Sequence, residues 1–238
     1  MSTAAVIVAG GRGTRMKGAA NKIFLEVGGR SILEWSLALF ERSPSVSTVI
    51  VVAQAGDIDP CRRLGSRFSK LAKVVPGGDL RHRSELAGVS ALSGQIDAGE
   101  VETVLVHDAV RPFATPALVD GLLQGMAGVQ ACIPGLPVSP TTVAVADGRV
   151  AGYPSGLWSV QTPQAADATW LLEAHNKAAR AGFVGTDTAS VIEWAGGDVR
   201  VIEGEPDNIK ITTPDDLRRA RLIAESRGEA TAEPPRPR

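Results

Sequence analysis

The sequence predicts an α/β protein built on a doubly wound, mostly parallel sheet, and two observations support this prediction. Short apolar runs of strand length alternate with segments that carry apolar residues at helical spacing. The strand-like runs are continuously apolar, which is typical of strands covered by helices on both faces. The chain has 238 residues, 44% of them hydrophobic, so it can bury a full core as one domain.

The expected elements follow in chain order. Four β-branched runs bounded by turn residues predict strands at 3–9, 48–53, 103–107 and 129–134. The segments between and beside them predict helices at 31–42, 60–70, 83–95 and 115–126. Two more helices are expected at 166–181 and 188–195, then a strand at 198–202. The last helix should begin at Thr213, because Thr is a good N-cap and Pro214 suits the first helical position.

Residues 134–158 interrupt the alternation and are rich in Pro, Gly, Thr and Val. Asp147-Gly148 is a typical hairpin turn between 142–146 and 149–152. Such a hairpin is either a plain surface excursion or an arm that embraces a second subunit. We predict one domain over 1–227 with a protruding β-arm at about 135–157, followed by a disordered, Pro-rich tail at 228–238.

Composition excludes several classes of protein. The 25 Lys and Arg residues balance 26 Asp and Glu residues, which argues against a nucleic-acid binder, and aromatic residues make up only 4%. No apolar run approaches the roughly 18 residues of a membrane-spanning helix. Cys61 and Cys132 lack the spacing of a metal or redox site. We therefore expect a cytoplasmic protein that binds neither nucleic acid nor membrane.

A glycine-rich segment with the sequence GGRGTRM follows the first strand at 10–16. Its backbone N–H groups can approach phosphates or a base without obstruction by side chains. It lacks the Lys of a P-loop, and Met16 stands where a dinucleotide fingerprint needs Gly or Ala, which disfavours an oxidoreductase. Two interpretations remain: an ordinary turn with solvated charges, or a nucleoside-triphosphate loop in which Arg15 and Lys22 neutralise the phosphates.

Six further motifs follow in order: PGG at 76–78 with Arg81 and Ser84, VHDAVRP at 106–112, GLW at 156–158, QTPQ at 161–164, TDxAS at 186–190 and DNIKIT at 207–212. With the glycine loop and Lys22, they resemble the 2-C-methyl-D-erythritol 4-phosphate cytidylyltransferase family over about 3–224. The resemblance implies a Rossmann-like nucleotidyltransferase fold. It also implies an enzyme of isoprenoid precursor synthesis that transfers CMP from CTP to this alditol phosphate and releases pyrophosphate.

The resemblance also implies roles for individual residues. Arg15 and Lys22 would be the catalytic cations. The CTP site would comprise Ala9, Gly10, Gly11, Gly13, Gly77, Gly78, Ser84, Asp108 and Ala109. The alditol phosphate would contact Arg111, Thr141, Thr162, Thr186, Asp207 and Lys210. A phosphate monoester is already anionic at neutral pH, so the reaction needs positioning and cations rather than a general base.

Asp108 directly follows the expected strand at 103–107, and the carboxyl ends of strands form the ligand crevice of an open α/β sheet. A carboxylate there would repel phosphates unless a divalent cation lay between them. Mg²⁺ prefers one or two carboxylates with phosphate oxygens and water. The resemblance agrees and makes Asp108 the Mg²⁺ ligand; the alternative is a turn or capping Asp. His107 is expected to be a partly buried histidine rather than a catalytic one.

The arm departs from the family pattern. The family's arm threonine, Thr141 here, reaches the site of the neighbouring subunit, which implies a homodimer. However, Pro140 and Val143 replace an Asp and a Lys, and Pro154 replaces an arginine that contacts the substrate phosphate. Asn21 also stands where the family has Pro. The second substrate therefore stays open, with ribitol 5-phosphate as the alternative. A CTP-binding regulatory protein without catalysis is the interpretation from a different class.

Overall fold

The computed structural model describes residues 2–11, 21–138 and 141–228, and its centre is an 8-stranded sheet. The strand order is β10-β7-β11-β6-β1-β4-β5, and β12 pairs with β7. These strands are β1 (Thr3–Val8), β4 (Val46–Ala53), β5 (Leu71–Pro76), β6 (Thr103–Asp108), β7 (Ala131–Pro137), β10 (Trp158–Val160), β11 (Gln164–Asp167) and β12 (Val199–Glu203). The chain passes from β1 to β4 and β5 on one side and then returns to β6 on the other side of β1.

Most of the sheet is parallel, as predicted. β1 pairs in parallel with both β4 and β6, and β12 with β7. The exceptions are β10 and β11: β10 runs antiparallel to β7, and β11 lies antiparallel between β6 and β7.

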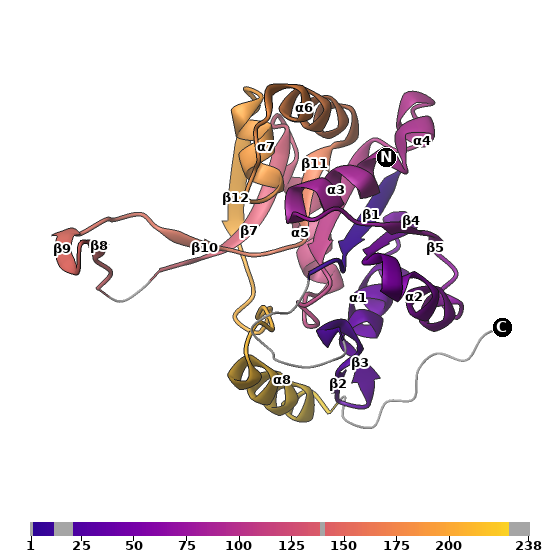
Figure 1. The fold of residues 1–238 in the computed structure, drawn as a ribbon, viewed down its shortest axis with the longest axis horizontal. Helices are drawn as coiled ribbons and strands as arrows, with labels where there is room; N and C mark the ends of the chain where they lie inside the picture. The colour runs from indigo at the N-terminus through magenta and orange to yellow at the C-terminus, as the bar shows by residue number, and fades with distance from the viewer. Residues whose placement is uncertain (1, 12–20, 139–140, 229–238) are drawn as a thin grey trace.

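Helices cover both faces of the sheet, so the fold is doubly wound (Figure 1). One face packs against α1 (Ile32–Glu41), α2 (Ile58–Gly65), α5 (Pro116–Gly125) and α8 (Pro214–Ser226). The other face packs against α3 (Arg81–Ser90), α4 (Ser93–Asp97), α6 (Ala168–Ala181) and α7 (Thr188–Trp194). In β1, Ala5 and Ile7 enter the first core, whereas Ala4 and Val6 enter the second. Burial on both faces explains why the strand is apolar at every position.

The helices begin where the sequence supplies caps. Ser31 and Glu34 form a capping box at the start of α1, and Thr213 and Asp216 form another at the start of α8. Helix α6 ends at Gly182, which adopts a left-handed φ of 70° that glycine tolerates without strain. The predicted start signal at Thr213 is therefore confirmed.

A narrow arm projects from the sheet at the level of β7 and β10 (Figure 1). Its tip is the hairpin of β8 (Ala144–Ala146) and β9 (Arg149–Gly152). The turn residues Asp147 and Gly148 have φ values of 50° and 74°, the left-handed conformation that a tight hairpin needs. The predicted hairpin and its protrusion are confirmed.

Several element predictions were wrong. The segment 83–95 is not one helix, because it divides into α3, which begins earlier, and α4. Helix α2 ends at Gly65, so 66–70 is not helical, and 166–167 belongs to β11 rather than to α6. Strands β5, β10 and β11 were missed. So were the short hairpin of β2 (Glu26–Val27) and β3 (Arg30–Ser31) and the 3-10 helices η2 (Lys22–Phe24) and η3 (Ala55–Asp57).

The predicted disordered tail lies, beyond Gly228, outside the described residues. Among the residues that are described, none of the helices has the length and apolar character needed to cross a membrane.

Candidate active site

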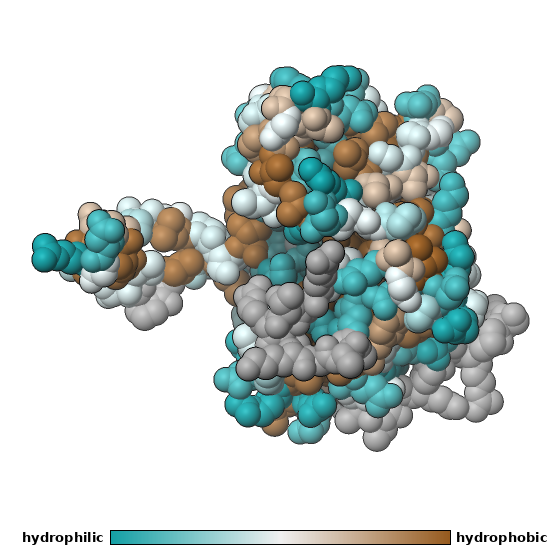
Figure 2. All heavy atoms as spheres, viewed as in Figure 1, coloured by the Kyte–Doolittle hydropathy of each residue, from teal (hydrophilic) through white to brown (hydrophobic). Residues whose placement is uncertain are grey.

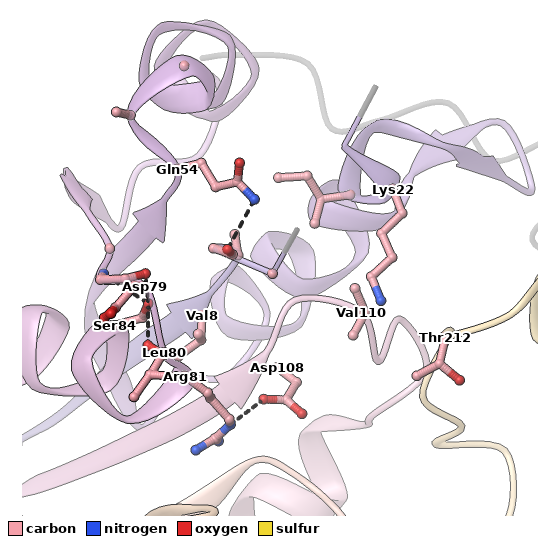
Figure 3. A pocket seen from close by; sticks show the side chains of 18 of the residues that line it. Val8, Lys22, Gln54, Asp79, Leu80, Arg81, Ser84, Asp108, Val110 and Thr212 are labelled. Atoms are coloured by element: carbon pink, nitrogen blue, oxygen red, sulfur yellow. Dashed lines mark hydrogen bonds and ion pairs between the residues drawn. The ribbon is translucent and has the colours of Figure 1, made fainter. Parts of the chain in front are cut away.

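A cavity of about 690 Å³ opens at the carboxyl ends of β1, β4, β5 and β6 (Figure 3). It lies where the chain reverses its direction across the sheet, the usual place for a ligand in this kind of fold. Many of the predicted site residues line it together: Ala9, Gly10, Gly11, Lys22, Gly77, Gly78, Ser84, Asp108 and Lys210. Four separate strand ends and the segment after β12 thus converge on one space.

Glycine backbone and the Ser84 hydroxyl form one wall of the cavity. The Gly78 N–H donates a hydrogen bond to Ser84 Oγ at 3.1 Å. A Cβ atom added to Gly77 would lie only 2.8 Å from Ser84 Oγ, and one on Gly10 would lie 3.3 Å from it. A side chain at Gly77 therefore could not fit without displacing Ser84. The Gln54 amide donates to the Gly10 carbonyl at 3.1 Å and holds the strand end in place.

Lys22 reaches into the cavity from η2, on the side opposite Arg81 (Figure 3). The Asn21 side chain accepts a hydrogen bond from the Ile23 N–H and caps this short helix. Lys22 Nζ donates to the Ile211 carbonyl at 3.0 Å, which orients the ammonium group at the rim. This placement puts a cation in the same cavity as the glycine wall.

Asp108 lies at the floor of the cavity between two cations. Arg81 Nε donates to its Oδ1 at 3.0 Å, and Lys210 Nζ donates to its Oδ2 at 2.7 Å. Burial disfavours the charged carboxylate, but the opposite charges of Arg81 and Lys210 outweigh this effect and lower the pKa of Asp108. Asp108 is thus an ionised, doubly paired group at neutral pH.

Behind Asp108, a buried hydrogen-bonded group fixes its backbone. The Asp108 N–H donates to Thr162 Oγ1 at 3.0 Å, and the same hydroxyl lies 3.1 Å from His107 Nδ1. Burial lowers the pKa of His107 to about 4, so its imidazole is neutral at physiological pH. Its Nε2 lies 3.1 Å from the Arg111 carbonyl oxygen, which leaves both ring nitrogens with partners. His107 is fully buried rather than partly buried, and it does not line the cavity.

The other predicted site residues lie outside the cavity lining. Ala109 is fully buried, and Thr162 stands behind Asp108. The Arg111 guanidinium donates to the backbone carbonyls of Asn208 and Val160 at 2.8 and 3.1 Å. Asp207 pairs with Arg227 at 3.0 Å. The remaining ones are exposed: Thr186 precedes α7, and Thr141 lies on the arm. Gly13 and Arg15 fall outside the described residues.

The donor set at Asp108 is chemically compatible with one Mg²⁺ ion if other ligands complete its shell. Among the described residues, no group of three or more His, Cys, Asp and Glu side chains could hold a metal by itself. Mg²⁺ needs only one or two carboxylates when phosphate oxygens and water complete its shell. Each oxygen of Asp108 accepts one hydrogen bond from a side chain and keeps a second lone pair. A pre-formed metal centre is thus not required for the predicted chemistry.

Sequence reasoning overlooked part of the cavity wall. Arg81 and Thr212 were recognised within motifs but received no role, and Gln54 was not considered, although all three line the cavity. A role for Arg81 could have been predicted from its position at the start of the helix that follows the PGG segment. Gln54 could have been found as the residue after a strand end.

The fold and the site together define an enzyme of the nucleotidyltransferase class: a doubly wound sheet with bare glycine backbone and cations around one carboxylate at its strand ends. Comparison with known proteins identifies the family. Residues 3–226 match the family described as IspD: 2-C-methyl-D-erythritol 4-phosphate cytidylyltransferase. The chain belongs to this family.

Relatives and solved structures agree with the family match. The chain is 40% identical over 230 residues to the 2-C-methyl-D-erythritol 4-phosphate cytidylyltransferase of Bacillus licheniformis, covering 95% of this chain and 97% of that protein. The 4-diphosphocytidyl-2C-methyl-D-erythritol synthase of Anaerococcus prevotii superposes with a TM-score of 0.82 at 30% identity, covering 94% of this chain and 96% of the other. The Thermus thermophilus cytidylyltransferase gives 0.73 at 33%, covering 92% and 98%.

Proposed function

We propose that this enzyme transfers CMP from CTP to 2-C-methyl-D-erythritol 4-phosphate. An oxygen of the alditol phosphate attacks the α-phosphorus of CTP, the bond to the β-phosphate breaks, and pyrophosphate leaves. The product is 4-diphosphocytidyl-2-C-methyl-D-erythritol. The observation that carries the proposal, beside membership of the family, is the cavity at the strand ends, where glycine backbone faces Lys22, Arg81 and Lys210.

The residues of the cavity suit a reaction between two anions. The bare backbone of Gly77 and Gly78 leaves space for a cytosine ring beside Ser84. Because the two N–H groups donate to the Ala53 carbonyl and to Ser84 Oγ, the carbonyl oxygens of this segment would accept from the cytosine amino group. Lys22 would neutralise the triphosphate, with Arg15 as a second cation. Lys210, which pairs with Asp108, would meet the phosphate of the second substrate. Because the attacking phosphate is already ionised, catalysis consists of positioning and of stabilising negative charge.

We propose that the reaction uses Mg²⁺ and that Asp108 holds the ion together with phosphate oxygens of CTP. The bound ion would supply neutralisation of charge on the phosphate oxygens. The donor chemistry of Asp108 supports this proposal, since one carboxylate with a free lone pair on each oxygen is the kind of ligand that Mg²⁺ prefers beside a nucleotide. Removal of divalent ions with EDTA should abolish turnover, and added MgCl₂ should restore it.

The proposed activity is tested by pyrophosphate release with CTP and Mg²⁺. Parallel reactions contain 2-C-methyl-D-erythritol 4-phosphate, ribitol 5-phosphate or no acceptor. We expect faster release with the methylerythritol phosphate. Faster release with ribitol 5-phosphate would overturn the substrate assignment and point to the altered arm residues. Tight binding of CTP with no release from either acceptor would indicate a regulatory protein instead.

We also propose that the enzyme is a homodimer joined through the arm. The arm and its base expose eight large hydrophobic side chains: Val138, Val143, Val145, Val150, Tyr153, Leu157, Trp158 and Val160. Figure 2 shows brown patches along the arm among pale and teal residues. Exposed apolar side chains gathered on one projecting segment favour a contact with another protein chain. Light scattering should give twice the chain mass of 24.8 kDa. A mass equal to one chain at micromolar concentration would contradict the dimer.

The expected cytoplasmic setting stays a prediction. It rests on cysteine usage: Cys61 and Cys132 are both free and buried.

A further inference from the structure

A fully buried carboxylate lies directly behind the floor of the cavity. Glu85 has no exposed surface, and it faces the cavity only through Arg81. Arg81 and Glu85 are four residues apart on α3, so they lie on the same face of the helix. Arg81 Nη1 donates to Glu85 Oε2 at 2.6 Å, while Arg81 Nε donates to Asp108 Oδ1. One guanidinium therefore joins a buried carboxylate to the carboxylate of the site.

Glu85 is itself held from the opposite side. His175, on α6, is fully buried and places Nε2 at 3.2 Å from Glu85 Oε1. The ring of His82 lies 4.8 Å from that of His175, and the Thr188 hydroxyl faces the same carboxylate. Burial disfavours the charge on Glu85, but the hydrogen bond from His175 and the charge of Arg81 outweigh it and lower the pKa of Glu85. Glu85 thus stays ionised and anchored between α3 and α6.

The geometry matters because a guanidinium is planar and presents its donors in a rigid fork. A single hydrogen bond from Nε to Asp108 would let the plane rotate about that bond. The second bond, from Nη1 to Glu85, fixes the plane. The third nitrogen, Nη2, is buried and has no hydrogen-bond partner among the described residues. Arg81 thus keeps one nitrogen without a partner while its orientation is set by two carboxylates.

We propose that Glu85 is a positioning residue for nucleotidyl transfer, which sets the orientation of Arg81 and, through it, of the Asp108 carboxylate. The inference rests on the proposed function, because it assumes that Asp108 and its cations act on CTP. A buried ion pair usually contributes little net stability, since desolvation offsets the attraction. Its effect here is geometric. Without the anion at 85, Arg81 is drawn onto Asp108 alone, and the carboxylate can turn with it.

The test is a double-mutant cycle between Glu85→Gln and Arg81→Ala, measured as kcat/KM for CTP. In the wild-type background, Glu85→Gln should lower kcat/KM for CTP roughly tenfold, in line with loss of a charge-assisted hydrogen bond. The KM for the alditol phosphate should change less than about twofold, which corresponds to almost unchanged binding energy for that substrate. In the Arg81→Ala background, Glu85→Gln should change kcat/KM very little, since the group through which it acts is gone.

The matched control is Glu34→Gln. Glu34 is also a mostly buried carboxylate that pairs with an arginine, Arg67, but it lies on α1 away from the cavity. We expect this variant to be less stable than wild type and unchanged in kcat/KM. A comparable loss of activity in Glu34→Gln would show that Glu85→Gln acts through general destabilisation.

Two results would overturn the inference: an unchanged kcat/KM in folded Glu85→Gln, or a loss of the same size in both backgrounds. If thermal melts show that Glu85→Gln is unfolded at the assay temperature, His175→Gln replaces it, with a smaller effect that must also vanish in the Arg81→Ala background. If wild-type enzyme releases no pyrophosphate, the proposed function has failed. The same cycle measured as calorimetric affinity for CTP with Mg²⁺ then still tests the positioning of Arg81.

Discussion

Replacing Gly88 with alanine should separate α3 from the sheet and impair the site that α3 carries. Gly88 lies on the buried face of α3, where the helix crosses β1 and β4. A Cβ atom at this position would lie 2.3 Å from Val6 Cγ1 and 2.8 Å from Val52 Cγ2, far closer than any stable contact. Both neighbours are fully buried core residues, so neither can turn aside into solvent.

The expected magnitude has two opposing contributions. Overpacking one methyl group into a dense core costs about 1–3 kcal/mol. Replacing glycine by alanine inside a helix returns roughly 0.5–1 kcal/mol. The two ranges combine to a net destabilisation between about 0 and 2.5 kcal/mol, with about 1 kcal/mol at the centre, which corresponds to a Tm decrease of about 2–4 °C for a chain of this size. Because Arg81 and Ser84 lie on the same helix, the KM for CTP should also increase.

Urea denaturation and steady-state kinetics of Gly88→Ala measure both effects. Gly94→Ala is the matched control, because a Cβ atom at Gly94 on α4 meets no atom within 4 Å. It should be at least as stable as wild type. A Val6→Ala substitution should partly rescue Gly88→Ala in a double-mutant cycle, with a coupling of at least about 0.5 kcal/mol. The reasoning is refuted if Gly88→Ala matches wild type in stability while Gly94→Ala does not exceed it.

Three further outcomes follow from the site. Lys22→Ala should lower kcat by about 10²–10³, the usual effect of losing one preorganised charge-stabilising group, and near-wild-type turnover would remove Lys22 from the mechanism. Gly77→Ala should raise the KM for CTP because its Cβ would collide with Ser84 Oγ, whereas Gly56→Ala, in the same cavity with no atom within 4 Å, should not. The third outcome concerns His107, whose pKa burial lowers to about 4. The unfolded chain, with a histidine pKa near about 6.5, binds the proton more readily between these values, so stability should fall by up to about 1.4 kcal/mol per pH unit as pH decreases from 6.5 towards 4. Urea denaturation at pH 7 and pH 5 should show this loss in wild type and a smaller loss in His107→Gln.

The elements that the sequence predicted well are those whose local pattern and tertiary role agree. Strand β1 is apolar at successive positions because both of its faces are covered, so its apolar pattern predicted a buried strand. The start of helix α8 was predictable from Thr213 and Pro214, because capping depends only on residues that are neighbours in the sequence.

Strand β11 shows what a local pattern cannot reveal. Its sequence, Gln164-Ala165-Ala166-Asp167, contains no β-branched residue and continues smoothly into α6. It is a strand because it fills the gap between β6 and β7 and pairs with both. The residues with which β11 pairs lie more than 30 positions away in the sequence, so its intrinsic propensity does not predict that it forms a strand. The edge strand β5 was missed for a different reason: the exposed Lys73 interrupts its apolar run.

The site shows the same division. The glycine segments directly follow the ends of β1 and β5, so their convergence was predictable from the parallel sheet. Lys22 lies further along the chain, on η2. The pairing of Arg81 with Asp108 depends on where α3 packs against the sheet, and this packing cannot be predicted from the spacing of the two residues in the sequence. The buried position of Glu85 could not be predicted for a related reason. A charged residue in a predicted helix is normally exposed, and only the structure shows that His175 and Arg81 permit its burial.

These contacts change the electrostatic argument for the site. Asp108 was expected to repel phosphates unless a metal ion shielded it, yet Arg81 and Lys210 already neutralise it. With Glu85 included, two carboxylates face two cations, so these four groups carry no net charge between them. Attraction for a triphosphate must then come from cations outside this group, and Lys22 is placed for that role at the opposite rim. If the alditol phosphate takes over Lys210, Asp108 keeps Arg81 but loses one of its two paired cations. The proposed Mg²⁺ would replace that lost positive charge beside Asp108.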